Sequence, residues 1–133
     1  MVQKMVRKVE LAALQPSELY LNQKEVREWL IAGFDKKELT ARPLPAIIYA
    51  GQIVLIGDHP RAFFAGQLGI SYTNITVYTE IDDLAVYKKK AALCREHEIF
   101  TVYDLAKQIL SPEDYERGWT EKINQIHSRH SQS

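Results

Sequence analysis

An aspartate, a histidine and an arginine lie close together where an apolar segment gives way to a turn. The run Ile53–Ile56 predicts a buried strand, and the turn Gly57–Arg61 follows it. Pro60 is typical of the first turn of a helix, where its missing N–H costs little. A strand that enters a helix in this way directs backbone N–H groups at one point, which favours phosphate, and His59 and Arg61 would strengthen it. A capped turn with a solvated arginine would show the same spacing.

Composition restricts the classes of function that fit the chain. With 133 residues it has the length of one domain, and its 17 Lys and Arg balance its 17 Asp and Glu. DNA-binding proteins usually carry a basic stripe, so DNA is not an expected partner. The one cysteine, Cys94, lies in a helical pattern, reads as a core thiol and suits a reducing compartment. No apolar run is long enough for a membrane span or a signal peptide, so we expect a soluble, cytoplasmic protein.

The first half of the chain alternates strands and helices. The expected elements are a strand at 8–14, a helix between Asn22 and Gly33, a loop at 34–45, a hairpin of 46–49 and 53–56, a helix from Pro60 to Gly69 and a strand at 75–78. Asn22 predicts an N-cap, and Glu25 follows at the spacing of a capping box. Val26, Trp29 and Leu30 fall on one face of that helix, which should be the packed face.

The second half reads as wholly helical. Asp82 or Asp83 begins one helix, and Lys88–Lys90 within it predicts a solvated face. Thr101 begins a second helix, and Ser111 begins a third, which is followed by a proline and two acids. The residues at packed spacing on the last helix are Tyr115, Trp119, Ile123 and Ile126. We expect one α+β domain at 1–127 and a frayed polar tail at 128–133.

The segment Gly57–Ala65 resembles the signature of the ParB/sulfiredoxin fold. In many ParB-like proteins an apolar strand leads into Asp-Gly-His-Thr-Arg and then into a helix that ends at Leu-Gly, as at Leu68-Gly69 here. Further similarity to small, stand-alone ParB-like proteins of bacteria lies in Leu14–Leu21, Pro43-Leu44-Pro45, Leu110–Glu116 and Trp119. The resemblance covers most of the chain. It implies a small mixed sheet with flanking helices and a helical C-terminal half.

The resemblance also implies a nucleotide site. ParB binds CTP at this turn, free-serine kinases bind ADP or ATP there, and sulfiredoxin binds ATP. Carried over, His59 and Arg61 would contact phosphates, and the amides of the turn, which includes Gly57, would surround them. Asp58 would lie near the metal, Mg²⁺, or near the transferred phosphoryl group.

The chain departs from the family pattern at positions that bear on phosphate binding and on catalysis. The order Asp-Gly is reversed as Gly57-Asp58, and Pro60 replaces a threonine that would supply a hydroxyl and an N–H. The glutamate that serves as base in the serine kinases is matched by Gln23. Asp58, Glu18 or Glu25 would then have to substitute for it. No cysteine lies in the turn, which disfavours sulfiredoxin chemistry.

The sequence therefore predicts a nucleotide-binding module for ATP, ADP or CTP with Mg²⁺, with weak or no catalysis. One alternative is a small-molecule kinase acting on a hydroxyl substrate such as serine, with Asp58 and Glu18 as its catalytic groups. Another is a protein-interaction module, a homodimer included, whose nucleotide turn is a relic and whose partner surface is the face of Trp119. No resident metal site is expected, because His127 and His130 lack further ligands.

Overall fold

A five-stranded mixed sheet forms the base of the molecule in the computed structural model, which describes residues 4–32 and 36–131. The strands are β1 (Lys4–Glu10), β2 (Leu14–Gln15), β3 (Leu21–Asn22), β4 (Leu44–Tyr49), β5 (Gln52–Leu55), β6 (Tyr72–Tyr78) and β7 (Ile109–Leu110). The sheet has the order β1-β6-β4-β5-β2, and β3 pairs with β7 separately. β1–β6 and β4–β5 are antiparallel, whereas β4–β6 and β2–β5 are parallel. The α+β class is confirmed.

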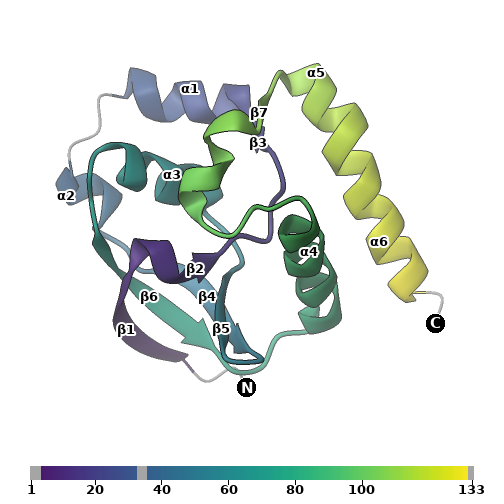
Figure 1. Ribbon diagram of the computed structural model, residues 1–133, viewed down its shortest axis with the longest axis horizontal. Helices are drawn as coiled ribbons and strands as arrows, with labels where there is room; N and C mark the ends of the chain where they lie inside the picture. Colours follow the sequence, from purple (N-terminus) through teal and green to yellow (C-terminus); the bar gives the residue numbers. More distant parts are fainter. Residues whose placement is uncertain (1–3, 33–35, 132–133) are drawn as a thin grey trace.

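Helices surround the sheet and make up most of the C-terminal half (Figure 1). The helices are α1 (Gln23–Ile31), α2 (Lys36–Leu39), α3 (His59–Gln67), α4 (Leu84–Glu96), α5 (Pro112–Tyr115) and α6 (Glu121–Ser131), with 3-10 turns η1 (Leu11–Ala13) and η2 (Val102–Lys107) and a π-helical turn η3 (Glu116–Thr120). Within the described ranges, no helix has the length and apolar character needed to cross a membrane.

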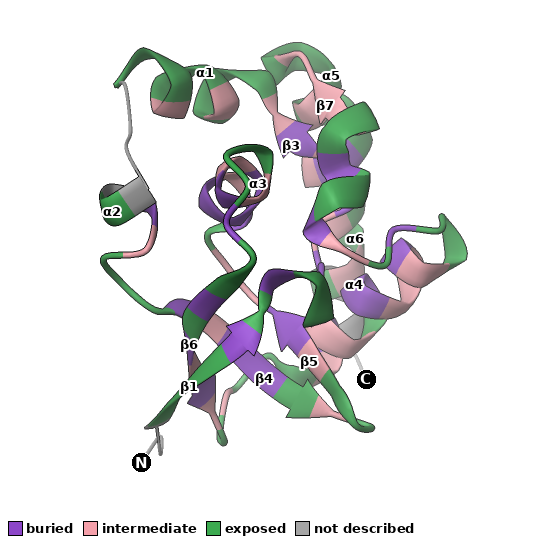
Figure 2. Ribbon diagram, turned by 60° about the vertical axis from the view of Figure 1, so that its left-hand side comes forward, coloured by how far each residue is buried: buried purple, intermediate pink, exposed green. Residues whose placement is uncertain are grey.

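Helix α3 occupies the centre of the molecule, between the sheet and α1 (Figure 2). Its Ala62 and Ala65 pack against inward-facing strand residues such as Leu55 and Ile75. Phe63, on another side of α3, joins a second cluster with Trp119 of η3. Because α3 carries a buried side chain on almost every side, the turn that begins it is held rigidly.

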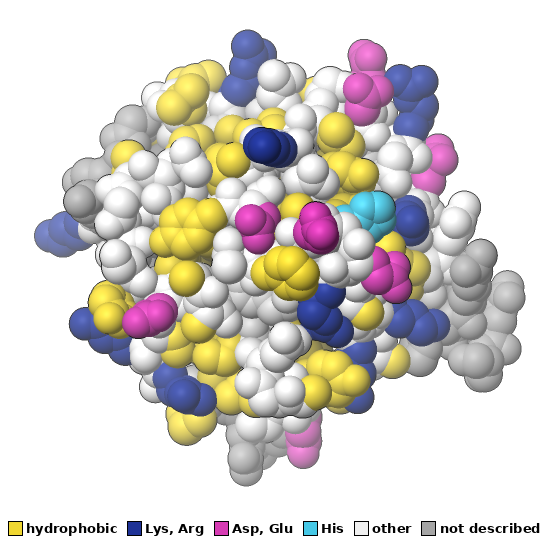
Figure 3. Space-filling model, viewed as in Figure 1, with side chains coloured by type: hydrophobic (Ala, Val, Ile, Leu, Met, Phe, Trp, Pro, Cys, Tyr) yellow, Lys and Arg dark blue, Asp and Glu magenta, His cyan; other side chains and the backbone are white. Residues whose placement is uncertain are grey.

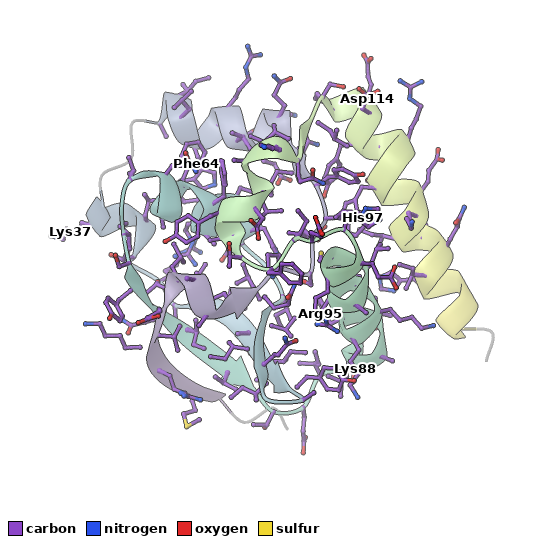
Figure 4. The ribbon with its side chains drawn as sticks, viewed as in Figure 1. Lys37, Phe64, Lys88, Arg95, His97 and Asp114 are labelled. Atoms are coloured by element: carbon purple, nitrogen blue, oxygen red, sulfur yellow. The ribbon has the colours of Figure 1, made fainter. Side chains whose placement is uncertain are left out.

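Helix α4 covers the part of the sheet formed by β4 and β5. Ala91 packs on Ile47 and Val54. Near the hairpin, Lys88 Nζ lies 4.5 Å from the centre of the Tyr49 ring, and Arg95 donates to Gln52 Oε1 at 2.8 Å (Figure 4). These contacts fix the helical C-terminal half to the sheet.

Several local predictions in the first half are confirmed. The hairpin has Tyr49 opposite Gln52, and α3 begins with Pro60 in its first turn and is followed by Gly69 at φ 80°. Asn22 caps α1 by accepting a hydrogen bond from the Lys24 N–H at 2.9 Å. The predicted helix end at Gly33 lies outside the described residues.

Other predictions in the first half are wrong. The strand expected at 8–14 is divided, because β1 ends at Glu10 and a 3-10 turn precedes β2. Leu30 is 68 % exposed, so the packed face of α1 consists of Val26 and Trp29 without it. The loop expected at 34–45 contains α2, whose Leu39 is buried, and begins β4. Helical and strand periods are hard to separate in segments this short.

In the second half, the expected helix starts are present but one element differs. Thr101 and Asp104 form the capping box, yet the helix that follows is a 3-10 helix. It is followed by β7, so this half is not wholly helical. Cys94 is fully buried, and burial raises the pKa of its thiol to about 12, as suits a core thiol. Lys90 contradicts the expected solvated face, because only 6 % of it is exposed.

Candidate functional site

A cavity of about 160 Å³ lies in front of the N-terminus of α3. Its walls come from the turn after β5, from the segment before α1 and from the C-terminal half. The lining residues are Glu18, Tyr20, Leu21, Glu25, Gly57, Asp58, His59, Pro60 and Tyr115. The sequence-predicted residues Gly57, Asp58, His59 and Glu18 are thus brought together, whereas Arg61 and Gln23 are not part of this lining.

Asp58 takes the conformation that a glycine would be expected to hold in this turn. Its φ of 57° and ψ of 31° are left-handed, and it precedes α3 without capping it through its side chain. Aspartate is among the residues that tolerate this conformation best. Gly57 does not have positive φ, but a Cβ there would lie 3.2 Å from Pro45 Cγ. The reversed order of the two residues therefore leaves a sharp turn in place, with the aspartate carrying the backbone strain.

Arg61 is a structural residue, because its guanidinium bonds to the protein itself. Only 1 % of it is exposed. Nη1 donates to the carbonyls of Leu39 and Arg42 at 3.1 and 2.6 Å. Nη2 donates to the Pro43 carbonyl at 3.3 Å and to Asp58 Oδ2 at 3.0 Å. The arginine thereby connects the segment before β4 to α3 and to the turn. Because both Nη atoms already donate to protein acceptors, the predicted contact of Arg61 with phosphate has no free Nη donor.

His59 is a buried, uncharged acceptor. Its Nε2 accepts a hydrogen bond from the Ser17 N–H at 3.0 Å, so the ring proton lies on Nδ1. Burial lowers the pKa of the imidazole to about 3, and the positive charge of Lys90 contributes to the lowering. The Ser17 hydroxyl donates to the Leu55 carbonyl at 2.6 Å. These two bonds fasten the Pro-Ser-Glu segment to the end of β5 and the start of α3.

The Glu18 carboxylate is held from two sides. Lys90 Nζ of α4 lies 3.4 Å from its Oε1, and Trp119 Nε1–H of η3 donates to its Oε2. The Trp119 ring also meets Tyr20 edge to face at 6.1 Å. Glu18 is therefore the point at which the opening segment, α4 and the C-terminal half meet beside the cavity.

Glu25, and not Gln23, lines the cavity. Glu25 lies on the first turn of α1, whereas Gln23 lines a different hollow together with Lys24 and Arg27. The capping box expected for Glu25 is not formed, since only the Asn22 half of it is present. Burial against the cavity raises the pKa of Glu25, and the negative charges of Glu18 and Glu28 raise it further.

The electrostatics of the cavity favour positive charge. Three carboxylates line it, and no lysine or arginine is among the lining residues of the described chain. Asp58 is paired with Arg61 and Glu18 with Lys90, both from behind the walls. Glu25 has no ion-pair partner among the residues that the structure describes. The N-terminus of α3 is the one source of positive potential in the lining.

Some lining residues carry no sequence signal for the cavity. Tyr115 packs against the cluster around Trp119, as its helical spacing predicts, and its half-buried side chain also forms part of the cavity wall. Burial, and then the charges of Glu18 and Glu25, raise the pKa of its phenol. No local signal marks Tyr20 or Leu21, because their place in the wall depends on β3 pairing with β7, far away in sequence.

Comparison with known proteins identifies no family for this chain. No protein-family model matches the sequence, and no curated protein matches it. Among solved structures, the chain is similar to the crystal structure of protein Atu1540 from Agrobacterium tumefaciens, with a TM-score of 0.46 and 10% sequence identity. The superposition covers 74% of this chain and 50% of that one, so the chain spans half the length of Atu1540.

Proposed function

We propose that the protein binds the phosphates of a nucleotide, together with Mg²⁺, at the start of α3. The observation that carries this proposal is the cavity that opens directly on the N-terminus of a nine-residue helix. Backbone amides and the helix dipole make such a position suited to phosphate. Arg61, Ser17 and His59 contribute by holding the turn in shape.

The size of the cavity limits what enters it. Pockets that enclose a whole drug-sized ligand usually have about 300–1,000 Å³, whereas this one has about 160 Å³. We therefore expect the terminal phosphates to enter and the base and sugar to remain at the surface. This arrangement would distinguish nucleotides weakly by their base, and ATP, ADP and CTP all stay candidates.

The carboxylates make a divalent cation part of the proposal. A polyphosphate without a metal would be repelled by the three carboxylates in the lining, which contains no basic residue to offset them. Mg²⁺ commonly uses one or two carboxylates and takes its other ligands from phosphates and water. Oxygen ligands from Glu25, Glu18 or Asp58 fit that chemistry. The described residues contain no cluster of three or more His, Cys, Asp or Glu that would hold a metal alone, so the nucleotide would complete the coordination.

A thermal-shift titration tests the proposal. ATP, ADP and CTP are each added with and without Mg²⁺ to the wild type, to Pro60→Glu and to Gln67→Glu. Both variants add one negative charge to α3, but Pro60→Glu adds it at the N-terminus, where an acid is compatible with the helix. We expect a Mg²⁺-dependent rise in Tm for the wild type and Gln67→Glu, and none for Pro60→Glu. No shift with any nucleotide, or equal shifts in all three proteins, would contradict it.

A second candidate function is phosphoryl transfer to a small hydroxyl substrate such as serine. Glu25 favours it, because a carboxylate with a raised pKa and no counter-ion in the described chain lies in the same cavity. Glu25 would accept the proton of the attacking hydroxyl, whose oxygen forms the new bond to phosphorus as the bond to the nucleoside diphosphate breaks. The test is formation of phosphoserine from serine and ATP. Product that is equal in the wild type and Glu25→Gln would exclude this role for Glu25.

DNA receives no support as a partner. On the face shown in Figure 3, acidic and basic side chains are interspersed without a stripe of one sign, in keeping with the zero net charge of the chain.

A further inference from the structure

The strand β1 forms an edge of the five-stranded sheet. It pairs with β6, and no other strand of the described chain pairs with its outer side (Figure 1). The Leu11 N–H donates to the Ser71 carbonyl at 2.8 Å, which continues the register of β1 and β6 by one pair. Because hydrogen-bonded and non-hydrogen-bonded pairs alternate along an antiparallel ladder, the N–H and C=O groups of Val6, Lys8 and Glu10 point away from β6. These groups form the free edge of the sheet.

The backbone of the free edge suits the addition of a further strand. Its outward N–H and C=O groups recur at every second residue, which is the spacing at which an added strand would meet them. Among the described residues, no hydrogen bond engages these groups. With seven residues, β1 is longer than a typical strand. In strand addition the backbone hydrogen bonds supply affinity and the side chains supply specificity.

The side chains along the free edge are basic and apolar. Val9 is buried in the core beneath α3, so Arg7 and Met5 lie on that same face, because side chains alternate along a strand. Lys8 and Val6 lie on the opposite face. Arg7 and Lys8 are exposed, and neither has a carboxylate partner within the described part of the chain. Met5 and Val6 are each more than half exposed. Each face of the edge therefore offers one positive charge and one apolar side chain.

A second copy of the chain does not fit this edge. Glu10, the one acid of β1, accepts a hydrogen bond from the Tyr72 hydroxyl at 3.3 Å, and the centre of that ring lies 5.5 Å from Lys8 Nζ. In an antiparallel dimer with its two-fold axis at Arg7 or at Lys8, that residue would lie opposite its own copy. An axis at Val6 would place Lys8 opposite the lysine at position 4. Like charges directly opposite each other destabilise a strand pair, and lysines on edge strands are one means by which proteins prevent self-pairing.

We propose that the free edge of β1 binds an extended, acidic segment of a partner protein, which joins the sheet as an antiparallel strand. Two consecutive acids would lie opposite Lys8 and Arg7, one on each face of the sheet, and two apolar residues would follow opposite Val6 and Met5. The partner segment therefore has the order acid-acid-apolar-apolar. No residue of β1 lines the cavity in front of α3, so this interaction is independent of the nucleotide site.

Binding of a short peptide with capped ends and the central sequence Glu-Glu-Val-Ile tests the proposal. One control peptide has Lys-Lys-Val-Ile, and another is N-methylated at the first Glu and at Val, whose N–H groups would face β1. The protein variants are Arg7→Gln/Lys8→Gln and the matched control Lys24→Gln/Arg27→Gln, which removes the same two charges from α1. All four positions are exposed, so both variants should fold. Binding and amide hydrogen exchange are followed by ¹⁵N NMR on the full chain.

In the wild type and the α1 variant, we expect saturable binding of the acidic peptide. Hydrogen exchange should slow at the outward amides of Val6, Lys8 and Glu10 and stay unchanged at Arg7 and Val9, which already pair with β6. Loss of both charges on β1 should weaken binding about fivefold or more, and each control peptide should bind at least about tenfold more weakly than the acidic one.

Three results with the peptides would overturn the inference: no saturable binding by the wild type, equal binding by the two variants, or equal binding of the N-methylated peptide. A single-stranded oligonucleotide is titrated in parallel. If it binds at the same edge more tightly than the acidic peptide, the charges of β1 serve nucleic acid instead, and the inference is also overturned.

Discussion

Replacement of Arg61 by methionine tests whether this arginine stabilises the fold or is a solvated side chain that is free to bind a ligand. Methionine keeps much of the side-chain volume and removes every guanidinium donor. The four hydrogen bonds of Arg61 end on three backbone carbonyls and on Asp58. If the arginine were solvated, its replacement would change the free energy of unfolding by no more than about 0.5 kcal/mol.

The expected loss is larger because the partners are partly enclosed. The Leu39 carbonyl, in a buried residue, would cost about 1–3 kcal/mol when left without a donor. The other two carbonyls belong to exposed residues and would cost about 0.5–1.5 kcal/mol each, since water can partly replace the arginine. The variant also removes the buried Arg61 Nε–H, which has no partner and whose loss returns about 1–3 kcal/mol. With each of these terms at the middle of its range, the net loss is about 2 kcal/mol.

Urea denaturation of the wild type, Arg61→Met and Arg117→Met measures this difference. Arg117 is a matched control, because it pairs with Asp114 at 3.0 Å with the same spacing of three residues but is 71% exposed. Its replacement should cost less than about 0.5 kcal/mol. A loss below about 1 kcal/mol for Arg61→Met would refute the structural role. It also follows that an Arg61 variant is a poor control for ligand binding, because it would change the turn itself.

Three further predictions concern the same turn. The pKa of His59 is about 3 in the folded protein and about 6.5 in the unfolded chain, so the stability that the neutral ring contributes is complete above pH 6.5 and is lost as the pH falls. Between pH 6.5 and about pH 5, the free energy of unfolding of the wild type should fall by about 2 kcal/mol more than that of His59→Gln. Parallel pH profiles of the two proteins would exclude this. Asp58→Ala should be about 1 kcal/mol less stable than Asp58→Gly, because both variants lose the carboxylate but only alanine is strained at a φ of 57°. Equal urea midpoints for the two variants would argue against the strained turn. Ser17→Ala should lose about 1–2 kcal/mol in the same assay, because the buried hydroxyl bonds to a carbonyl, and an unchanged midpoint would show that this bond contributes nothing.

The parts of the fold that were predicted correctly depend on neighbours in sequence. The cap at Asn22, the proline that begins α3 and the hairpin between β4 and β5 each arise within a few residues. Backbone preference and capping act over such distances, so the sequence displays them directly. The cluster of Gly57, Asp58 and His59 in one turn was found for the same reason.

The parts that were missed depend on partners far along the chain. Lys90 looked solvated because its charge partner, Glu18, is 72 residues away. The role of Arg61 depends on carbonyls of a segment about 20 residues earlier, and no side-chain pattern marks a carbonyl as an acceptor. Glu25 carries a helix-cap spacing, but tertiary packing places it at the cavity instead. Tertiary partners of this kind decide which charged residues form the site.

An NMR titration with Mg²⁺-ADP tests the central claim most directly, because it reports where the nucleotide binds. Backbone amides of Gly57, Asp58 and His59 lie at the N-terminus of α3, whereas those of Gly66 and Gly118 lie away from the cavity lining. The account predicts saturable shifts at the first three amides that require Mg²⁺, with the two distant glycines little changed. Saturable shifts elsewhere with the turn unaffected, or no shifts at all, would contradict it.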